Sequence, residues 1–371
     1  MTDISETQNW GPVTRIEQSD TVGPGGNETN APNRQFAELV GRDKWLYDAL
    51  AALGLTPDST IGDIKETLAG DATAAATEES TLTLAAASVA QGRLTLATGD
   101  PVPTSDITAA STLYYTPYNG DRVALYNTAQ ARWDMYSFTE RSLDISGLSA
   151  DTNYDIFLYD DAGTLTLEAV AWATSGAGTS TRASAISRRN GVWVKDADDR
   201  RYLGTIRITD VAGECEVSDT FSGIWNVANQ VETLKTIMLE GIGDYTYATT
   251  AWRKVYNSND YRVDLVCGLD QQIRCDALLV VYGDGASINV ATGVGLNSQT
   301  TNSAQLYANS PKSDNDTNGI FAFACYLIGR GYNYLNQLEW GDPDLKVTGS
   351  WQGSGRTANY GNSGMVVTWR Y

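Results

Sequence analysis

The sequence contains no histidine among its 371 residues. Histidine is the commonest general base and a usual zinc ligand, so its absence excludes Ser-His-Asp and Cys-His catalysis. An enzyme of this composition would have to work with carboxylates, lysine or tyrosine. Lysine and arginine (26) are outnumbered by aspartate and glutamate (45), which gives a formal charge of −19. This charge argues against nucleic acid or an anionic membrane as partner, because both bind basic patches.

Cysteines and long apolar runs are also scarce. The four cysteines, Cys215, Cys267, Cys275 and Cys325, show no CxxC spacing. The first ten residues carry no basic-then-apolar signal, and no apolar run approaches the ~18 residues of a membrane span. We therefore expect synthesis in a bacterial cytosol, reduced thiols and no membrane insertion. Cys267 and Cys275 could meet across a hairpin, but free, half-buried thiols are the favoured interpretation.

Amphipathic aromatics are plentiful: tyrosine (20) and tryptophan (10) far exceed phenylalanine (6). Such side chains suit β-sheets and binding surfaces. At about 150 residues per domain, the length predicts two or three folded units.

The N-terminal third is predicted to be an arm, short helices and a linker. Residues 1–32 include the Gly/Pro/Asn stretch at 23–27, which cannot pack a core, and have few apolar anchors beyond Trp10, Val13 and Ile16. Residues 33–70 carry apolar side chains at helical spacing, with stop signals at Gly54 and Gly70. Residues 71–91 are an Ala/Thr/Glu-rich linker.

Two later segments, 92–217 and 241–371, alternate with a period of two and are interrupted by Asn-Gly and Asp-Ala-Gly turns. Each predicts a β-sandwich-like unit, the second forming a C-terminal knob. In the first, Leu148 precedes Tyr154 by six residues, as in the tyrosine corner of fibronectin-like sandwiches.

Between these units, residues 218–240 show apolar residues at heptad spacing. This pattern predicts a helix whose seam joins three chains. The alternative is a helix that packs on a neighbouring sheet. The seam residues would be Ile224, Val227, Val231, Leu234 and Met238.

Two short motifs carry possible chemistry. Asp314-x-Asp316-x-Asn318-Gly319 matches the first six positions of a calcium loop, but position twelve is Cys325 instead of glutamate. A solvated polar turn is the favoured interpretation, with calcium as the alternative. Residues 195–201, KDADDRR, offer a carboxylate pair of the kind used in glycoside hydrolysis, but charged hairpin turns have the same composition.

Aromatic residues in the C-terminal unit suggest sugar recognition. They stand among Gly, Asn and Asp residues, and planar rings beside short polar side chains suit a pyranose. The alternative is that these rings fill a core or a subunit interface. The candidate glycan-binding residues are Tyr332, Tyr334, Trp340, Trp351 and Tyr360.

The start of the chain, from WGPVTRIEQ to GRDKWL, resembles the N-terminal attachment segment of phage tail-fibre proteins. Its matching features are Ile16-Glu17, the glycine-rich turn at 22–26, Asn33-Arg34-Gln35, and the helix pattern Leu39-x-x-Arg42-x-x-x-Leu46. The middle of the chain, from GRLTLATGD to YLGTIRIT, looks like a β module of phage virion proteins. The resemblance therefore covers roughly residues 10–240.

The resemblance implies an elongated homotrimeric fibre. Its arm, with Trp10, Val13, Ile16 and Glu17, would attach to other virion proteins of the head or tail, and its first helices would bundle with Leu39 and Leu46 at the seam. The expected fold class is mainly β with short helices, in which two β-sandwich-like units are separated by a heptad helix.

Three functions are compatible with these features. The first is a non-catalytic virion fibre of a bacteriophage or phage-like particle, whose C-terminal unit contacts host surface polysaccharide and needs no cofactor. The second is a structural head-fibre or tail-connector component without a receptor site. The third, a capsule depolymerase, needs an acidic pair in a groove, and the β-helix repeats common in such enzymes are not visible.

Overall fold

The computed structural model describes residues 86–239, 245–247, 249–283, 288–307, 310–312, 317–341, 345–347 and 363–371. The chain divides into two units, Met1–Leu82 and Thr83–Tyr371, and all described residues belong to the second. These residues are mostly strands, which confirms the mainly-β class; a single-turn 3-10 helix, η1 (Val255–Asn257), lies among them. The predicted arm, the helices over 33–70 and most of the linker lie outside the described residues.

The first half of the second unit builds a three-stranded sheet, a seven-stranded sheet and a hairpin. One sheet has the order β1 (Gly92–Thr95), β3 (Thr112–Pro117), β6 (Arg141–Asp144). The hairpin is β4 (Arg122–Asn127) with β5 (Arg132–Ser137). The other sheet has the order β10 (Ile186–Arg189), β11 (Val192–Lys195), β12 (Arg201–Arg207), β7 (Asn153–Asp161), β8 (Thr164–Thr174), β9 (Thr181–Arg182), and β15 (Ile224–Asn226) also pairs with β12.

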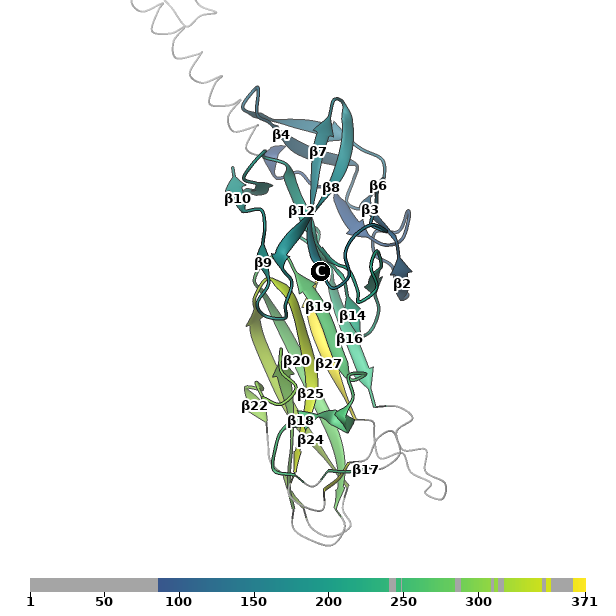
Figure 1. Cartoon of the computed structure of the whole chain (residues 1–371), viewed down its shortest axis with the longest axis vertical. Coiled ribbons are helices and arrows are strands. Elements are labelled where there is room, and N and C mark those ends of the chain that lie inside the picture. Colours follow the sequence, from purple (N-terminus) through teal and green to yellow (C-terminus); the bar gives the residue numbers. More distant parts are fainter. Residues whose placement is uncertain are drawn as a thin grey trace, which may run out of the picture. The chain divides into compact units, whose positions relative to one another are not determined.

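The second half builds two sheets, of eight and seven strands. One has the order β2 (Ile107–Ala110), β13 (Cys215–Val217), β14 (Phe221–Ser222), β19 (Arg262–Cys267), β25 (Gly331–Gly341), β21 (Ile288–Leu296), β23 (Ser310–Lys312), with β18 (Arg253–Lys254) also on β25. The other has the order β16 (Glu232–Met238), β27 (Gly364–Arg370), β20 (Gln271–Gly283), β24 (Thr317–Ile328), β22 (Leu306–Tyr307), with β17 (Tyr245–Thr246) and β26 (Leu345–Val347) attached to it. In Figure 1, β24 and β27 run alongside β20, with which both pair.

An Asn-Gly turn forms a hairpin at the place where the sequence predicts one. Asn190 and Gly191 both have positive φ (50° and 84°), and they link Arg189 of β10 to Val192 of β11 as the two residues of a tight turn. Asparagine and glycine tolerate this left-handed backbone better than other residues, so an Asn-Gly pair fixes the register of the hairpin.

The predicted tyrosine corner is confirmed. The Tyr154 side chain is 6% exposed, and its hydroxyl accepts a hydrogen bond from the backbone N–H of Ser149 at 2.9 Å. The hydroxyl thereby satisfies a backbone donor while the ring packs in the core with Ile156 and Ile206. The four cysteines are free, as predicted, but only Cys325 is half-buried, whereas Cys215, Cys267 and Cys275 are buried.

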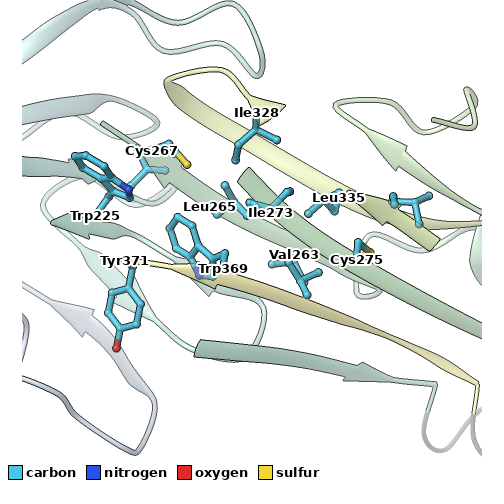
Figure 2. Packing of buried hydrophobic residues seen from close by; sticks show 14 of the residues in the cluster. Trp225, Val263, Leu265, Cys267, Ile273, Cys275, Ile328, Leu335, Trp369 and Tyr371 are labelled. Carbon is cyan, nitrogen blue, oxygen red and sulfur yellow. The ribbon is translucent and has the colours of Figure 1, made fainter. Parts of the chain in front are cut away.

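The buried apolar side chains of the described residues form four clusters, and the two largest are the main cores. The smaller one fills the first half around Leu94, Leu113 and Ile156. The larger one lies between the two sheets of the second half and also takes Phe157 and Tyr202 from the first half. In Figure 2, the rings of Trp225, Trp369 and Tyr371 lie at one end of this cluster, and Leu265, Ile273 and Leu335 continue it between the strands. From residues 218–240, the larger core includes Trp225 and Ile237.

The predicted heptad helix over residues 218–240 is wrong. The segment forms β14, β15 and β16 instead, and β16 pairs with β27 along seven residues from Glu232 to Met238. Asn229, between β15 and β16, has a φ of 56°, which a right-handed helix excludes. The β-branched Thr233, Thr236 and Ile237 also favour a strand.

A buried ion pair joins the first-half sheet to the turn between β19 and β20. The guanidinium of Arg182 donates to Asp155 at 2.6 Å and to the backbone carbonyl of Gly268 at 2.5 Å, and it lies 4.6 Å from the ring centre of Trp172. Asp155 also accepts a hydrogen bond from Thr205 at 2.7 Å. The side chains of Arg182 and Asp155 are 8% and 3% exposed, so each charge depends on the other.

We predict that Arg182→Ala lowers the free energy of unfolding by about 3–5 kcal/mol, because it leaves the Asp155 carboxylate buried without its cation. Urea unfolding measures this change. The control is Arg132→Ala, which breaks a solvent-exposed pair with Asp134 (2.8 Å) and should cost about 0.2–1 kcal/mol. Equal losses in the two variants would contradict the assigned role of Arg182.

Candidate functional site

The structure brings two of the predicted glycan-binding residues together on β25. Tyr332 and Tyr334 alternate with the buried Asn333, so their rings share one face of the strand, with ring centres 6.2 Å apart. Trp340 is eight residues beyond Tyr332 on the same strand, which places it roughly 26 Å from Tyr332 at ~3.3 Å per residue. Trp351 and Tyr360 lie outside the described residues.

Both tyrosine rings are engaged by arginines. The Arg207 guanidinium lies 3.7 Å from the ring centre of Tyr332, and that of Arg262 lies 5.0 Å from the centre of Tyr334. The Tyr332 hydroxyl donates to the Asp264 carboxylate, which also pairs with Arg262 at 2.7 Å. These contacts occupy ring surface that a sugar would need, and glycan binding by the predicted set stays a prediction.

The other predicted sites lie mostly outside the described residues. These are the arm residues Trp10, Val13, Ile16 and Glu17, the first seam residues Leu39 and Leu46, and the calcium-loop carboxylates Asp314 and Asp316. The backbone of Asn318 belongs to β24. Within the described ranges, no group of three or more His, Cys, Asp and Glu side chains is placed to hold a metal ion.

The second group of seam residues is split between the core and the surface. Ile224 is 1% exposed and belongs to the smaller core, and Val227 and Val231 pack against the larger one. Leu234 and Met238, by contrast, are 62% and 40% exposed on β16. Because they are four residues apart, they point to the same face of the strand, away from the core side chains of Lys235 and Ile237.

Leu234 and Met238 belong to a larger exposed apolar surface, which we call the outer face. It is the side of the β16–β27–β20–β24–β22 sheet that points away from the larger core. Five of the ten exposed large hydrophobic side chains among the described residues lie on it. These are Leu234, Met238, Leu306, Phe321 and Leu327.

Strand register aligns the outer face into rows. Met238 pairs with Gly364, Gly364 with Leu278, and Leu278 with Phe321, so one apolar row crosses four strands. Met238, Gly364, Leu278 and Phe321 all line a surface hollow of about 190 Å³. A side chain from another surface can enter a hollow of this kind.

The charges on the outer face are already paired. Arg274 contacts Asp276 at 2.9 Å on β20, and Arg370 of β27 contacts Glu232 of β16 at 3.5 Å. On β16, β27 and β20, the two pairs cancel although the whole chain carries −19. Sequence analysis placed a strand in this region, within the β pattern of residues 241–371, but missed that its outward side chains are apolar and exposed. The signal was FAFACYLI, residues 321–328, which is apolar at both alternating positions and therefore has no polar face for water.

A buried carboxylate, Glu339 on β25, is the strongest candidate for acid–base chemistry. It is fully buried, and it accepts hydrogen bonds from Arg253 at 2.7 Å and Tyr245 at 2.5 Å. Burial raises its pKa, and the bonds from Tyr245 and Arg253 offset this only in part. Perturbed carboxyl groups mark many active sites, but a substrate must be able to reach them. With its side chain fully buried, Glu339 is a structural group.

No family model and no curated protein matches the sequence. Several solved structures are weakly similar to it. A mutant VP2 protein of infectious bursal disease virus has 9% identity and a TM-score of 0.26 over 73% of this chain and 72% of that one. A β-porphyranase of glycoside hydrolase family 86 from Bacteroides plebeius has 7% identity and a TM-score of 0.22 over 73% and 36%.

An insecticidal delta-endotoxin from Bacillus thuringiensis has 8% identity and a TM-score of 0.20 over 76% of this chain and 52% of that one. TM-scores this low carry no argument about the function of this chain. In the described part of the chain, no helix is both long enough and apolar enough to cross a membrane.

The raised pKa of Glu339 predicts a pH dependence of stability. Because the folded state holds the proton more tightly than the unfolded state, stability falls as pH rises from the ordinary pKa of 4.5 through the raised value. Glu339→Gln should remove this dependence, so its stability relative to wild type should rise as pH increases from the ordinary pKa of 4.5 through the raised pKa. Urea unfolding across this range measures the difference.

The control carboxylate is Glu140. Burial raises its pKa, but hydrogen bonds from Thr116, Thr98 and the Gly99 backbone outweigh that effect and lower it. Its contribution to stability is therefore present above pH 4.5 and lost as pH falls through the lowered pKa, so Glu140→Gln should shift the profile in the opposite sense. Parallel profiles for wild type and Glu339→Gln would contradict the assignment of Glu339.

Proposed function

We propose that this chain is a subunit of a homotrimeric virion fibre or spike, which attaches a bacteriophage or phage-like particle to host surface glycan without catalysis. The observation that carries the proposal is the outer face. Exposed apolar patches of this kind mark protein interaction sites, because leaving them in water is unfavourable. In a homo-oligomer, such a face would be buried against a neighbouring subunit.

A second copy of the chain is the occupant that the charges favour. Two molecules with a net charge of −19 repel each other, so they associate most readily through a surface that is locally neutral. On β16, β27 and β20, the outer face meets this condition, since Arg274 and Arg370 are balanced by Asp276 and Glu232. The hollow at Gly364 provides a place for an exposed side chain such as Phe321 of a neighbouring copy.

The sequence supports the virion setting. Residues 10–46 resemble a fibre attachment segment, and adhesion by several linked sites turns weak sugar contacts into strong attachment. The structural alternative, a head-fibre or tail-connector component, is favoured by the arginine contacts of Tyr332 and Tyr334, which leave these rings less free for a receptor.

We predict that the purified chain has a native mass of three subunits and that Phe321→Asp shifts it to monomers. A carboxylate in a dry interface costs about 3 kcal/mol, which corresponds to at least ~100-fold weaker association. Native mass spectrometry and analytical ultracentrifugation measure the change. Val211→Asp alters an exposed apolar residue in a turn away from the sheet and should leave the mass unchanged. A monomeric wild-type chain would refute the proposal.

Cys325 supplies a second readout at the same surface. It lies on the outer face opposite Arg274, whereas Cys215, Cys267 and Cys275 are buried. Burial raises the pKa of the Cys215 thiol to about 12, which makes it unreactive as well as inaccessible. Maleimide should therefore label the Phe321→Asp monomer at Cys325 and leave the assembled wild type largely unlabelled. Rapid labelling of the assembled wild type would place the interface elsewhere.

We also predict that deletion of residues 1–32 leaves a soluble homo-oligomer that no longer joins particles, because the arm makes the contact with other virion proteins. Co-sedimentation with particles measures the loss, and native mass verifies assembly. If the truncated chain still sediments with particles, the arm is not the attachment segment.

A further inference from the structure

A groove on the first half of the unit combines tyrosine rings with carboxylates, and we call it the tyrosine groove. Its volume is about 340 Å³, near the lower end of the roughly 300–1,000 Å³ typical of ligand sites. The buried side chains of Leu125 and Leu158 lie behind its wall. The side chains used below are Tyr126, Tyr136, Tyr159, Asp160, Asp198 and Arg200. Arginines already cover the rings of Tyr126 and Tyr159, at 4.3 Å and 3.9 Å, so the ring offered to a ligand is that of Tyr136.

These side chains come from separate elements that the fold brings together. Tyr126 and Tyr136 lie on the β4–β5 hairpin, Tyr159 and Asp160 at the end of β7, and the remaining two on the turn before β12. The Tyr136 hydroxyl donates to the Asp160 carboxylate at 3.2 Å, which links the hairpin to β7. The groove is therefore held by tertiary contacts and is not a single exposed turn.

Most charges around the groove are already neutralised. Arg200 lies 3.9 Å from the ring centre of Tyr159 and pairs with Glu168 at 2.8 Å and Asp198 at 3.0 Å. Asp199, also in the lining, pairs with Arg189 at 2.6 Å. The other arginine of the lining, Arg201, is buried and donates to the backbone carbonyls of Ala87 and Ala124, so neither Arg200 nor Arg201 is free to bind a phosphate, a sialic acid or a uronic acid.

Asp160 differs from the other carboxylates in the groove. Its two oxygens accept hydrogen bonds from the Gly163 backbone at 2.7 Å and from Tyr136, and both donors are neutral. Asp160 is solvent-exposed, so its remaining acceptor positions are open to a ligand. Burial and the Asp160 charge raise the pKa of Tyr136, so its phenol stays neutral at physiological pH.

We propose that the tyrosine groove binds a neutral saccharide, either a hexose or an N-acetylhexosamine residue of a larger glycan. The ring of Tyr136 packs against the C–H face of the sugar, and Asp160 accepts hydrogen bonds from its hydroxyls. Excess carboxylate in the lining disfavours acidic sugars. This inference deepens the proposed glycan attachment and places its site on the β4, β5 and β7 strands instead of the C-terminal aromatics.

The test uses the full-length chain on a printed array of neutral, N-acetylated, sialylated and uronic acid oligosaccharides. We expect binding to neutral or N-acetylated probes only. Isothermal titration with the best probe should then show at least about tenfold weaker binding for Tyr136→Ala, and near-wild-type binding for Tyr136→Phe, which keeps the ring. Tyr118→Ala, which removes an exposed tyrosine outside the groove, should bind as wild type.

Asp160→Ala provides a second variant at an exposed position, and it should also weaken binding at least about tenfold by removing a charged acceptor. No binding by wild type, selective binding of acidic probes, or binding unaffected in both Tyr136→Ala and Asp160→Ala would overturn the proposal. Release of reducing ends from the bound probe would also overturn it, because the groove would then be catalytic. Native mass separates these outcomes from a failure of the proposed assembly.

Discussion

The alternation of side chains across a β-strand constrains everything else in this unit. In the β16–β27–β20–β24 sheet, one set of alternating residues, including Trp369 and Cys275, fills the larger core. The other set must then face outward, and on β24 it is as apolar as the inner one. A strand with two apolar faces needs cover on both sides. The larger core covers one side of the sheet. The outer face is uncovered in the single chain and is available for contact with another protein surface.

The two halves of the unit are fastened where their sheets meet. Phe157 and Tyr202 enter the larger core from the first half, and Arg182 ties Asp155 to the Gly268 carbonyl of the second. An apolar contact alone would allow the sheets to slide, whereas a buried, directional ion pair accepts only one arrangement. This connection holds the outer face and the tyrosine groove in a fixed relation within one compact body.

Many of the strands could be predicted from the sequence, but which strands pair and which side chains meet in the fold could not. The runs RVALYN and NYDIFLYDD became β4 and β7, and the Asn190-Gly191 turn and the Tyr154 corner formed as expected, because each depends on local chemistry. The heptad pattern failed because Leu234 and Met238, four apart, share a face in a strand as well as in a helix. Spacing alone could not reveal β27 as the partner of β16, nor bring Tyr136 to Asp160, since these contacts join residues distant in sequence.

The outer face and the tyrosine groove have different chemical character and are proposed to have different roles. The face is apolar and its charges on β16, β27 and β20 cancel, as association between copies of a strongly acidic molecule requires. The groove is polar, keeps an exposed carboxylate at Asp160 and shares no residue with the face. Assembly through the outer face therefore does not itself bury residues of the groove. Each added copy then brings another groove, and attachment strengthens by multiplicity while every single sugar contact stays weak.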